Sequence, residues 1–315
     1  MDWIDRYKQQ LEQIFEEAQQ RIGSFPKPLN TIGLVYADKF HPVKHMGRVD
    51  YICTLLPFWM KDTASISDAQ CARLALANVY GMLYFFIQDD VMDSAPSSNG
   101  KEQLALGNLL LLEMFSVFRE LFPSGSPFWH YYNRYVATWA DCVVNEDRDN
   151  YFITDPVRMA WKAGPVKIAS TGALLLSGLE AKIPKLENAI DIILMTLQMS
   201  DDWADWKEDL AEGSYNGLLA MISASRSSQE EALTEQTAEN AIYVSGCLKQ
   251  YVQLARDNHV RLLAMELEAV ELIDFHSYML NQLNKIAERI DSNRSQLLKG
   301  GFEYLLSKLA INKEQ

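Results

Sequence analysis

The sequence lacks several features that mark common protein classes. Its four cysteines lie far apart and form no Cys-x-x-Cys or Cys/His ligand spacing. This excludes a structural zinc site and favours buried free thiols. Basic residues are also scarce, because 29 Lys and Arg stand against 42 Asp and Glu, for a formal net charge of −13. Such an acidic chain is a poor partner for nucleic acid, whose phosphates are normally met by a basic patch.

Long apolar runs are missing as well. The most apolar stretches, such as LGNLLLLEMF at 106–115, are too short and too interrupted to span a bilayer. The first 22 residues are amphipathic and charged, without the apolar core of a signal peptide. We therefore expect no stable membrane insertion and a cytoplasmic location. Apolar residues make up 48 % and charged residues 23 % of the chain, which is an ordinary globular composition.

Strand-like alternation is rare in the sequence, whereas helical periodicity is common. Apolar residues recur at three- and four-residue spacing, with breakers rich in Gly, Pro and Ser between the runs. The ranges predicted to be helical are 3–20, 46–60, 68–92, 102–121, 128–146, 155–178, 185–210, 231–271 and 273–310. No fixed repeat appears, so a solenoid is disfavoured. We predict an all-α single domain, 1–315, of roughly ten helices, with 1–30 as an N-terminal helical segment packed on the bundle.

A first acidic motif follows a run that reads as buried. The stretch YFFIQDDVMD places Asp89, Asp90 and Asp93 directly after aromatic and aliphatic residues. The helix predicted over 68–92 is apolar nearly all round, so we expect other helices to surround it. Carboxylates gathered at the rim of an apolar wall repel one another and resist desolvation. The motif therefore predicts a bound cation.

A second acidic motif lies in LQMSDDWADWKEDLAEG, residues 197–213. Asp201, Asp205 and Asp209 are four residues apart and form one helical stripe that drifts by about 40° per step. They too follow an apolar helix. Two solvated helix ends are the alternative interpretation, since charged helix surfaces are ordinary. Composition alone seldom produces two such motifs, which favours a shared function.

Magnesium fits these carboxylates better than other metals do. Calcium prefers an EF-hand-like loop or a cage of about six to eight protein oxygens. A diferrous bundle needs Glu-x-x-His pairs, and none of the five histidines stands in that spacing. Magnesium keeps several waters and takes one or two carboxylates together with substrate phosphate oxygens. We therefore predict a magnesium-bound phosphate.

The pairing of DDVMD with DDWADWKED in an all-α chain resembles the class I isoprenoid synthases, which include terpene cyclases and trans-prenyl diphosphate synthases. The resemblance spans roughly residues 51–216. It implies a helical bundle around a central apolar cavity, with the two motifs facing each other across the cavity mouth. Several Mg²⁺ ions would hold the diphosphate of an allylic isoprenyl substrate there. The implied metal ligands are Asp89, Asp90, Asp93, Asp201, Asp205 and Asp209.

The resemblance also implies cations and a cavity wall. Negative charge that grows on the leaving diphosphate needs fixed cations, and the carbocation must be kept from water. Arg158 and Lys162 are the candidate catalytic cations, and Lys207 joins them as a ligand of the substrate diphosphate. The candidate cavity-lining residues are Phe58, Trp59, Tyr84, Phe85, Phe86, Trp161, Gln198 and Trp203. Ordinary core packing and exposed helix charges are the alternatives for these residues.

The two branches of the family differ where this sequence gives mixed signals. Chain-elongating synthases usually follow the first motif with an Arg-Arg pair, but residues 94–101 read SAPSSNGK. Lys44 and Arg48 in VKHMGRVDY echo the elongators' upstream Gly-Lys-Arg segment, and Asp at all three places of the second motif is closer to elongators. By contrast, KEDLAEGSYN at 207–216 looks like the cyclase pattern.

The missing Arg pair favours a magnesium-dependent terpene cyclase that makes a terpene hydrocarbon or alcohol. The alternative is a trans-prenyl diphosphate synthase that condenses an allylic diphosphate with isopentenyl diphosphate. A third hypothesis is a non-catalytic subunit of a partner synthase, and a homodimer is compatible with all three.

Overall fold

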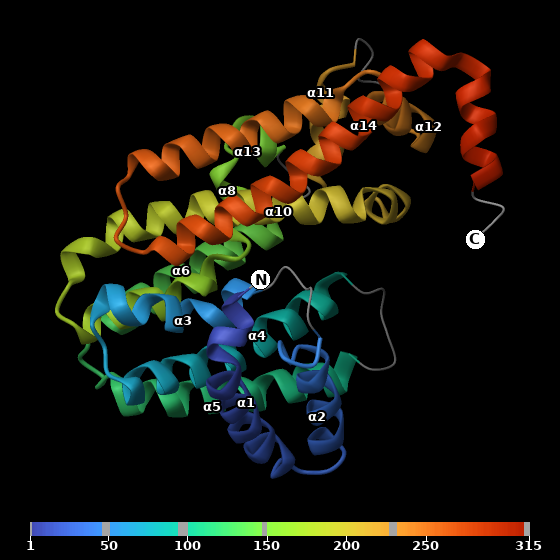
Figure 1. Ribbon diagram of the computed structural model, residues 1–315. Coiled ribbons are helices and arrows are strands. Elements are labelled where there is room, and N and C mark those ends of the chain that lie inside the picture. Colours follow the sequence, from blue (N-terminus) through green and yellow to red (C-terminus); the bar gives the residue numbers. More distant parts are fainter. Residues whose placement is uncertain (1, 46–50, 94–99, 147–149, 227–231, 312–315) are drawn as a thin grey trace. The chain divides into compact units, whose positions relative to one another are not determined.

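The computed structural model describes residues 2–45, 51–93, 100–146, 150–226 and 232–311, and these ranges contain helices and no β-strand. The α-helices are α1 (Asp2–Gly23), α2 (Leu29–Lys39), α3 (Tyr51–Ala64), α4 (Asp68–Asp93), α5 (Gly100–Leu121), α6 (Phe128–Val144), α7 (Tyr151–Thr154), α8 (Val157–Trp161), α9 (Lys167–Leu176), α10 (Ile183–Glu212), α11 (Gly217–Ala224), α12 (Glu235–Glu239), α13 (Cys247–Ala264) and α14 (Val270–Ile311) (Figure 1). Short 3₁₀ turns at Gly164–Val166 and Glu180–Lys182 and a π turn at Asn240–Val244 connect some of them. The all-α prediction is confirmed.

The helix boundaries differ from the predicted ranges in several places, and helices α2, α7 and α11 lie outside those ranges. The range 155–178 is divided into α8 and α9, because Pro165 has no N–H to donate to a continuous helix. The range 231–271 is divided before α13, where Gly246 has a left-handed φ of +79°. Helix α2 was not predicted. It is 11 residues long and contains Gly33 and several β-branched residues, so its helical pattern is weak.

The chain forms two compact units. The first contains residues 1–139 and 163–188, and the second contains residues 140–162 and 189–315. Helices α6 and α10 contribute residues to both units. In the described ranges no helix combines the length and the apolar character that crossing a membrane requires.

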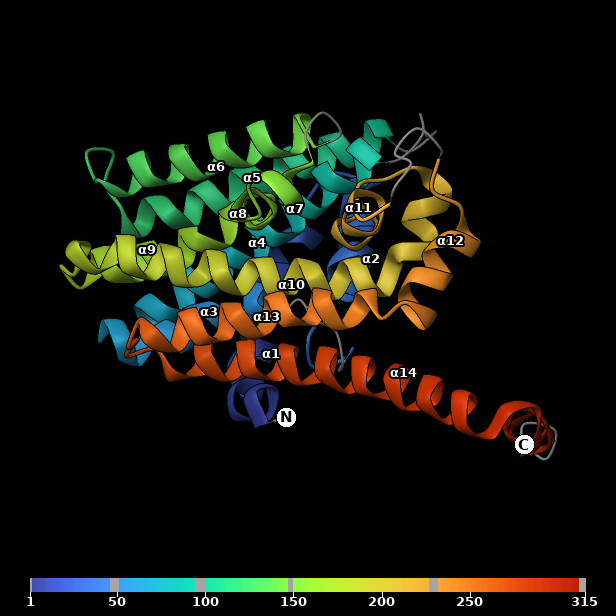
Figure 2. The ribbon, with the colours of Figure 1, turned by 90° about the horizontal axis from the view of Figure 1, so that it is seen from above.

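Helices α4 and α5 lie side by side in the first unit (Figures 1 and 2). Glycines permit their close approach: a Cβ at Gly107 would lie 3.1 Å from Gln88 Nε2, and one at Gly81 would lie 3.0 Å from the Met114 sulfur. The fully buried residues of α4 include Leu74, Ala77, Tyr80 and Leu83. The helix is therefore enclosed, as its apolar sequence predicted, and its carboxyl end carries the first acidic motif.

The second unit is built on α10, α13 and α14. Helices α13 and α14 form an antiparallel pair (Figure 2), and α14 bends at Gly301, where φ is +54°. Inside the unit, Thr196 Oγ1 lies 2.8 Å from His276 Nε2, and His276 Nδ1 lies 3.0 Å from His259 Nδ1. Burial lowers the pKa of His276 to about 3. These three helices are thus linked by an uncharged hydrogen-bonded network near neutral pH.

Candidate functional site

The first acidic motif occupies the last turns of α4. The Asp89 side chain is exposed, and the half-buried Asp90 accepts a hydrogen bond from the Tyr36 hydroxyl of α2 at 2.8 Å. Asp93 is the last residue of α4, and its side chain lies outside the described part of the chain. Carboxylates at the carboxyl end of a helix are disfavoured by its dipole. A cation at this end would relieve both that interaction and the mutual repulsion.

The aromatic residues before this motif are half-buried and pack against other rings of the first unit. Phe85 lies with its ring centroid 5.0 Å from that of Trp139, and Phe86 lies 5.0 Å from Phe40. Tyr84 contacts Phe85 edge to face at 5.0 Å. These rings lie on α4 in the turns directly before the carboxylates, and their role as a cavity lining stays a prediction.

Two other predicted cavity residues lie in the contact between α1 and α3. Phe58 stacks on Tyr7 with centroids 5.0 Å apart, and Trp59 contacts Trp3 at 5.9 Å. Both Phe58 and Trp59 are buried. Their described contacts are therefore with the N-terminal helix.

The second acidic motif lies on α10, and its carboxylates are distributed around the helix axis. Asp205 is exposed, Asp201 and Asp209 are half-buried, and Asp202 is 2 % exposed. Since a helix turns by about 100° per residue, Asp209 lies about 80° around the axis from Asp201 and about 20° from Asp202. The third carboxylate of the predicted stripe is thus turned toward the buried face of the helix.

Asp202 anchors α10 to two other elements of the second unit. Its Oδ2 accepts hydrogen bonds from the Gly217 N–H at 3.0 Å and from the Tyr251 hydroxyl at 2.8 Å. Its Oδ1 accepts a bond from Gln198 Nε2 at 3.0 Å, so Gln198, predicted to line the cavity, contacts this carboxylate. Burial raises the pKa of Asp202 to about 6, and the hydrogen bonds oppose that rise.

Asn216 links this anchor to the third carboxylate of the motif. Its Oδ1 caps α11 by accepting hydrogen bonds from the N–H groups of Leu218 and Leu219, at 3.0 and 3.1 Å. Its Nδ2 donates to the Asp202 carbonyl at 2.8 Å and to Asp209 Oδ2 at 2.7 Å. Burial raises the pKa of Asp209, and the bond from Asn216 opposes that rise.

Lys162 is the predicted cation whose charge acts on the second motif. It forms an ion pair with Glu146. Burial dominates the pKa shifts of Asp202 and Asp209, and the positive charge of Lys162 opposes the rise at both. A negatively charged ligand near these groups would meet a cation that is half-buried rather than fully solvated.

The other two predicted cations have different described contacts. Arg158 pairs with Asp141 at 2.7 Å and lies 4.2 Å from the centre of the Tyr151 ring. Lys207 is held by two glutamates of α12, at 2.8 and 2.7 Å. Ion pairs with Glu235 and Glu239 raise the pKa of Lys207. Lys207 would have to leave this pairing, at least in part, to bind a diphosphate.

The two remaining predicted aromatic residues belong to the second unit. Trp203 is half-buried and packs against the core around Met199 and Trp206. Trp161, the last residue of α8, is also half-buried. Both tryptophans therefore combine packed and exposed ring surface.

The donor set of the two motifs fits magnesium by its chemistry. It consists of carboxylate oxygens on helices, with no His or Cys ligand in either motif. Among the described residues, no three side chains of His, Cys, Asp or Glu are arranged to hold a metal ion by themselves. A site that supplies one or two carboxylates and leaves positions for water and phosphate oxygens suits Mg²⁺ with a phosphate ligand.

Sequence reasoning missed two residues of this arrangement, Tyr36 and Tyr251, and it included Asn216 only in the cyclase-like pattern at 207–216, without a structural role. Asn216 had a signal, since Asn directly before the apolar run GLLAMI is a helix N-cap pattern. The tyrosines had none, because they lie 54 and 49 residues from the aspartates that they contact. The upstream basic segment stays untested: Gly47 and Arg48 lie outside the described residues, and Lys44 forms an ion pair with Asp38.

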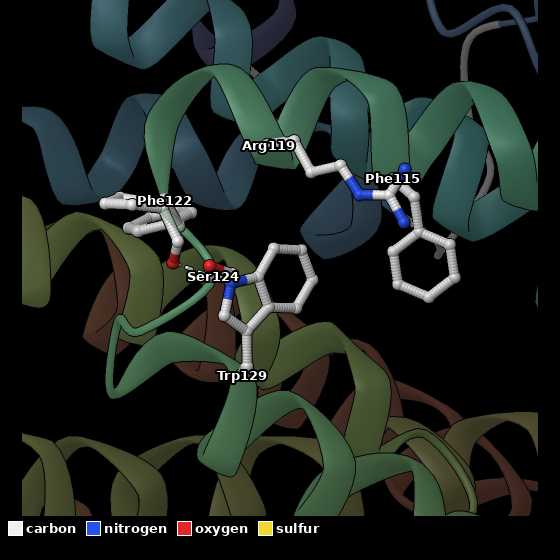
Figure 3. Close-up of a pocket in the computed structure, with 6 residues that line it drawn as sticks. Phe115, Arg119, Phe122, Ser124 and Trp129 are labelled. Carbon is white, nitrogen blue, oxygen red and sulfur yellow. Dashed lines mark hydrogen bonds between the residues drawn. The ribbon is translucent and has the colours of Figure 1, made fainter.

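A pocket that the sequence did not predict lies at the carboxyl end of α5 (Figure 3). Phe115 and Arg119 of α5 and Trp129 of α6 line it, with the Arg119 guanidinium 5.9 Å from the Phe115 ring centre. Trp129 Nε1 donates to the Pro123 carbonyl at 3.0 Å. The first acidic motif precedes the opposite end of α5, so this pocket is separate from the carboxylates of that motif.

Comparisons with known proteins identify a structural relative. No family model matches the sequence, and no curated protein matches it. The structure is similar to that of a polyprenyl synthase from Caulobacter crescentus CB15, complexed with calcium and isoprenyl diphosphate, with a TM-score of 0.68 and 15 % sequence identity. The match covers 88 % of this chain and 96 % of that chain. The fold is therefore that of the class I isoprenoid synthases, and the resemblance is confirmed at this level.

Proposed function

We propose that this chain is an isoprenoid synthase that binds the diphosphate of an allylic isoprenyl substrate through divalent metal ions. The observation that carries the proposal is the combination of this fold with two aspartate motifs that expose carboxylates, Asp89 in the first and Asp205 in the second. Each motif would contribute carboxylates that bind divalent metal ions. The carboxylates within each motif repel one another, and bound cations would relieve that repulsion.

The chemistry of each side chain determines its proposed role. Asp89, Asp93, Asp201, Asp205 and Asp209 would hold Mg²⁺, with Asp90 as a further candidate. Bound Mg²⁺ supplies charge stabilisation for the departing diphosphate.

Lys162 would bind a diphosphate oxygen and add a fixed positive charge, with Arg158 and Lys207 as further candidates. The half-buried rings next to the motifs, such as Phe85 and Trp203, would exclude water from the hydrocarbon end of the substrate. Their faces would also stabilise cationic carbon.

For the reaction itself, chain elongation has the better support. The structural relative is a polyprenyl synthase, and Asp stands at all three places of the second motif. The proposed reaction joins an allylic diphosphate to isopentenyl diphosphate and releases diphosphate. The second candidate is terpene cyclisation, which the absence of an Arg pair after Asp93 favours.

One incubation series distinguishes these reactions. The purified chain is supplied with geranyl, farnesyl, geranylgeranyl and longer diphosphates in Mg²⁺, with and without isopentenyl diphosphate, and diphosphate release and products are measured. An elongator needs isopentenyl diphosphate and yields a longer diphosphate, whereas a cyclase yields a hydrocarbon or alcohol without it. No turnover under any condition would contradict both and favour a non-catalytic subunit.

Three associated predictions have their own measurements. Replacement of Mg²⁺ by Ca²⁺ or Mn²⁺ in the assay tests the identity of the metal. Light scattering after size exclusion tests the homodimer. The cytoplasmic location stays a prediction from the N-terminal sequence and is tested by fractionation of the source cells.

A further inference from the structure

The loop between α10 and α11 contacts the second acidic motif from its buried side. Asn216 is 2 % exposed, and its side-chain amide makes four hydrogen bonds. Two N–H groups of α11 reach Oδ1, so the NH₂ group must face the two remaining partners, both of which are acceptors. The amide is then fully satisfied, and its orientation is determined by its neighbours.

The surroundings of Asn216 leave this loop little freedom. The next residue, Gly217, donates its N–H to Asp202, whose carboxylate is held in turn by Tyr251. A Cβ at Gly217 would lie 2.7 Å from Asp202 Oδ2 and 2.8 Å from Phe152. The packing is therefore too close for any side chain there. Helix α11 is also anchored in the core through Leu218, Leu219 and Ile222.

We propose that Asn216 is a positioning residue that holds the Asp209 carboxylate in the orientation needed to bind the divalent metal. The inference rests on the proposed function, because it assumes that Asp209 is a metal ligand. Asn216 donates to Oδ2 of Asp209 at 2.7 Å, which leaves Oδ1 and the second lone pair of Oδ2 for a cation. Outer-shell hydrogen bonds of this kind fix ligating carboxylates and tune metal affinity.

The test separates the bond to Asp209 from the cap of α11. Asn216→Ser keeps a good N-cap but is too short to reach Asp209, whereas Asn216→Gly removes the whole side chain at little cost to a cap. Both lose the same donor. Thr234→Gly is the matched control, because Thr234 caps α12 by accepting from the Thr237 N–H and the described bonds of its side chain are with Thr237.

Two readouts are taken on the full chain. The first is the rise of Tm with Mg²⁺ concentration in the presence of inorganic diphosphate, and the second is diphosphate release as a function of Mg²⁺. We expect both Asn216 variants to raise the midpoint Mg²⁺ concentration about tenfold, whatever their own Tm without metal. Saturating Mg²⁺ should restore most of their turnover, whereas Asp209→Asn should not be restored. Thr234→Gly should keep the wild-type midpoint.

The outcomes distinguish this inference from the proposed function. Midpoint Mg²⁺ concentrations that stay at the wild-type value in both Asn216 variants would overturn the inference. So would midpoints that rise in proportion to each variant's loss of Tm, since both variants lose the same donor to Asp209. If one variant does not fold, the other decides. A wild-type chain that gains no Tm from Mg²⁺ and diphosphate and releases no diphosphate would overturn the proposed function, and the inference with it.

Discussion

The two acidic motifs use their paired aspartates alike but at different depths. In the first motif, the half-buried Asp90 accepts a bond from the hydroxyl of Tyr36. In the second, Asp202 is 2 % exposed and accepts bonds from the hydroxyl of Tyr251, from a backbone N–H and from an amide. Adjacent residues point about 100° apart on a helix, and in each pair the second Asp is more buried than the first.

The two motifs therefore differ in how firmly their more buried aspartate is bonded to neighbouring helices. The first motif ends its helix and relies on a partly solvated contact with α2. The second continues along α10 and is connected to α11 and α13 through buried groups. We expect loss of an outward carboxylate to impair chemistry in both motifs. Loss of the anchor should affect stability mainly in the second.

The largest expected effect follows removal of the exposed carboxylates. Asp89→Ala and Asp205→Ala should each reduce diphosphate release by about two decades or more, since each removes a metal ligand. Their stability without metal should equal or exceed that of the wild type, because one of several mutually repelling carboxylates is removed. The control is Glu208→Ala, an exposed carboxylate of α10 outside the stripe. Wild-type turnover in either Asp variant would break the comparison.

The buried anchor should give a pH-dependent stability. The pKa of Asp202 in the folded chain is about 6, above its ordinary value, so the folded state holds its proton more tightly than the unfolded state. The stability that results is complete below about pH 4 and is lost as the pH rises through about 6.

Asp202→Asn removes this titration. Relative to wild type, the variant should gain up to about 3 kcal/mol between pH 4 and pH 7. Urea unfolding in EDTA at a series of pH values measures the difference. A difference that does not vary with pH would show that Asp202 has an ordinary pKa.

The two tyrosines sharpen the comparison between the motifs. Tyr251→Phe leaves a buried carboxylate without one of its donors and should destabilise the chain by about 1–3 kcal/mol. Tyr36→Phe affects a half-buried carboxylate that water can reach, so we expect a loss below about 1 kcal/mol. Urea unfolding without metal compares the two variants directly. Equal losses would mean that the motifs are anchored alike.

The smallest expected effect concerns the cations. Lys162→Ala should lower diphosphate release about tenfold, less than the loss of a metal ligand, because the metal ions still carry part of the charge. Arg158→Ala should have a smaller effect, since Arg158 already contacts Asp141, Cys142 and Tyr151. Release kinetics at saturating Mg²⁺ rank the two. The reverse order would assign the main diphosphate contact to Arg158.

The sequence was most informative where a pattern depends on local geometry. Apolar periodicity predicted the enclosed helix α4 and the long α10, and the four-residue spacing predicted that Asp201, Asp205 and Asp209 follow one another around the helix. The drift of that stripe is also a local property, because it follows from the helical pitch alone.

The remaining features depend on contacts that spacing does not encode. The pattern DDWAD does not tell which aspartate is buried, because that depends on Tyr251, 49 residues later. Lys207 was assigned to the diphosphate, yet its described partners are glutamates of α12. Helix α2 was missed although it supplies the partner of Asp90, because its weak propensity is compensated by tertiary packing.

The Asn216–Gly217 pair also affects the chemical stability of the protein. In an unfolded chain such a pair deamidates readily, because the glycine nitrogen meets no Cβ as it attacks the asparagine amide carbon and expels ammonia. In the folded chain, Gly217 N–H is bonded to Asp202, and the Asn216 amide is held on both sides. Deamidation of Asn216 is therefore expected mainly while the chain is unfolded. Deamidation would replace the donor facing Asp209 with a carboxylate, so conformational stability protects the covalent structure next to the second motif.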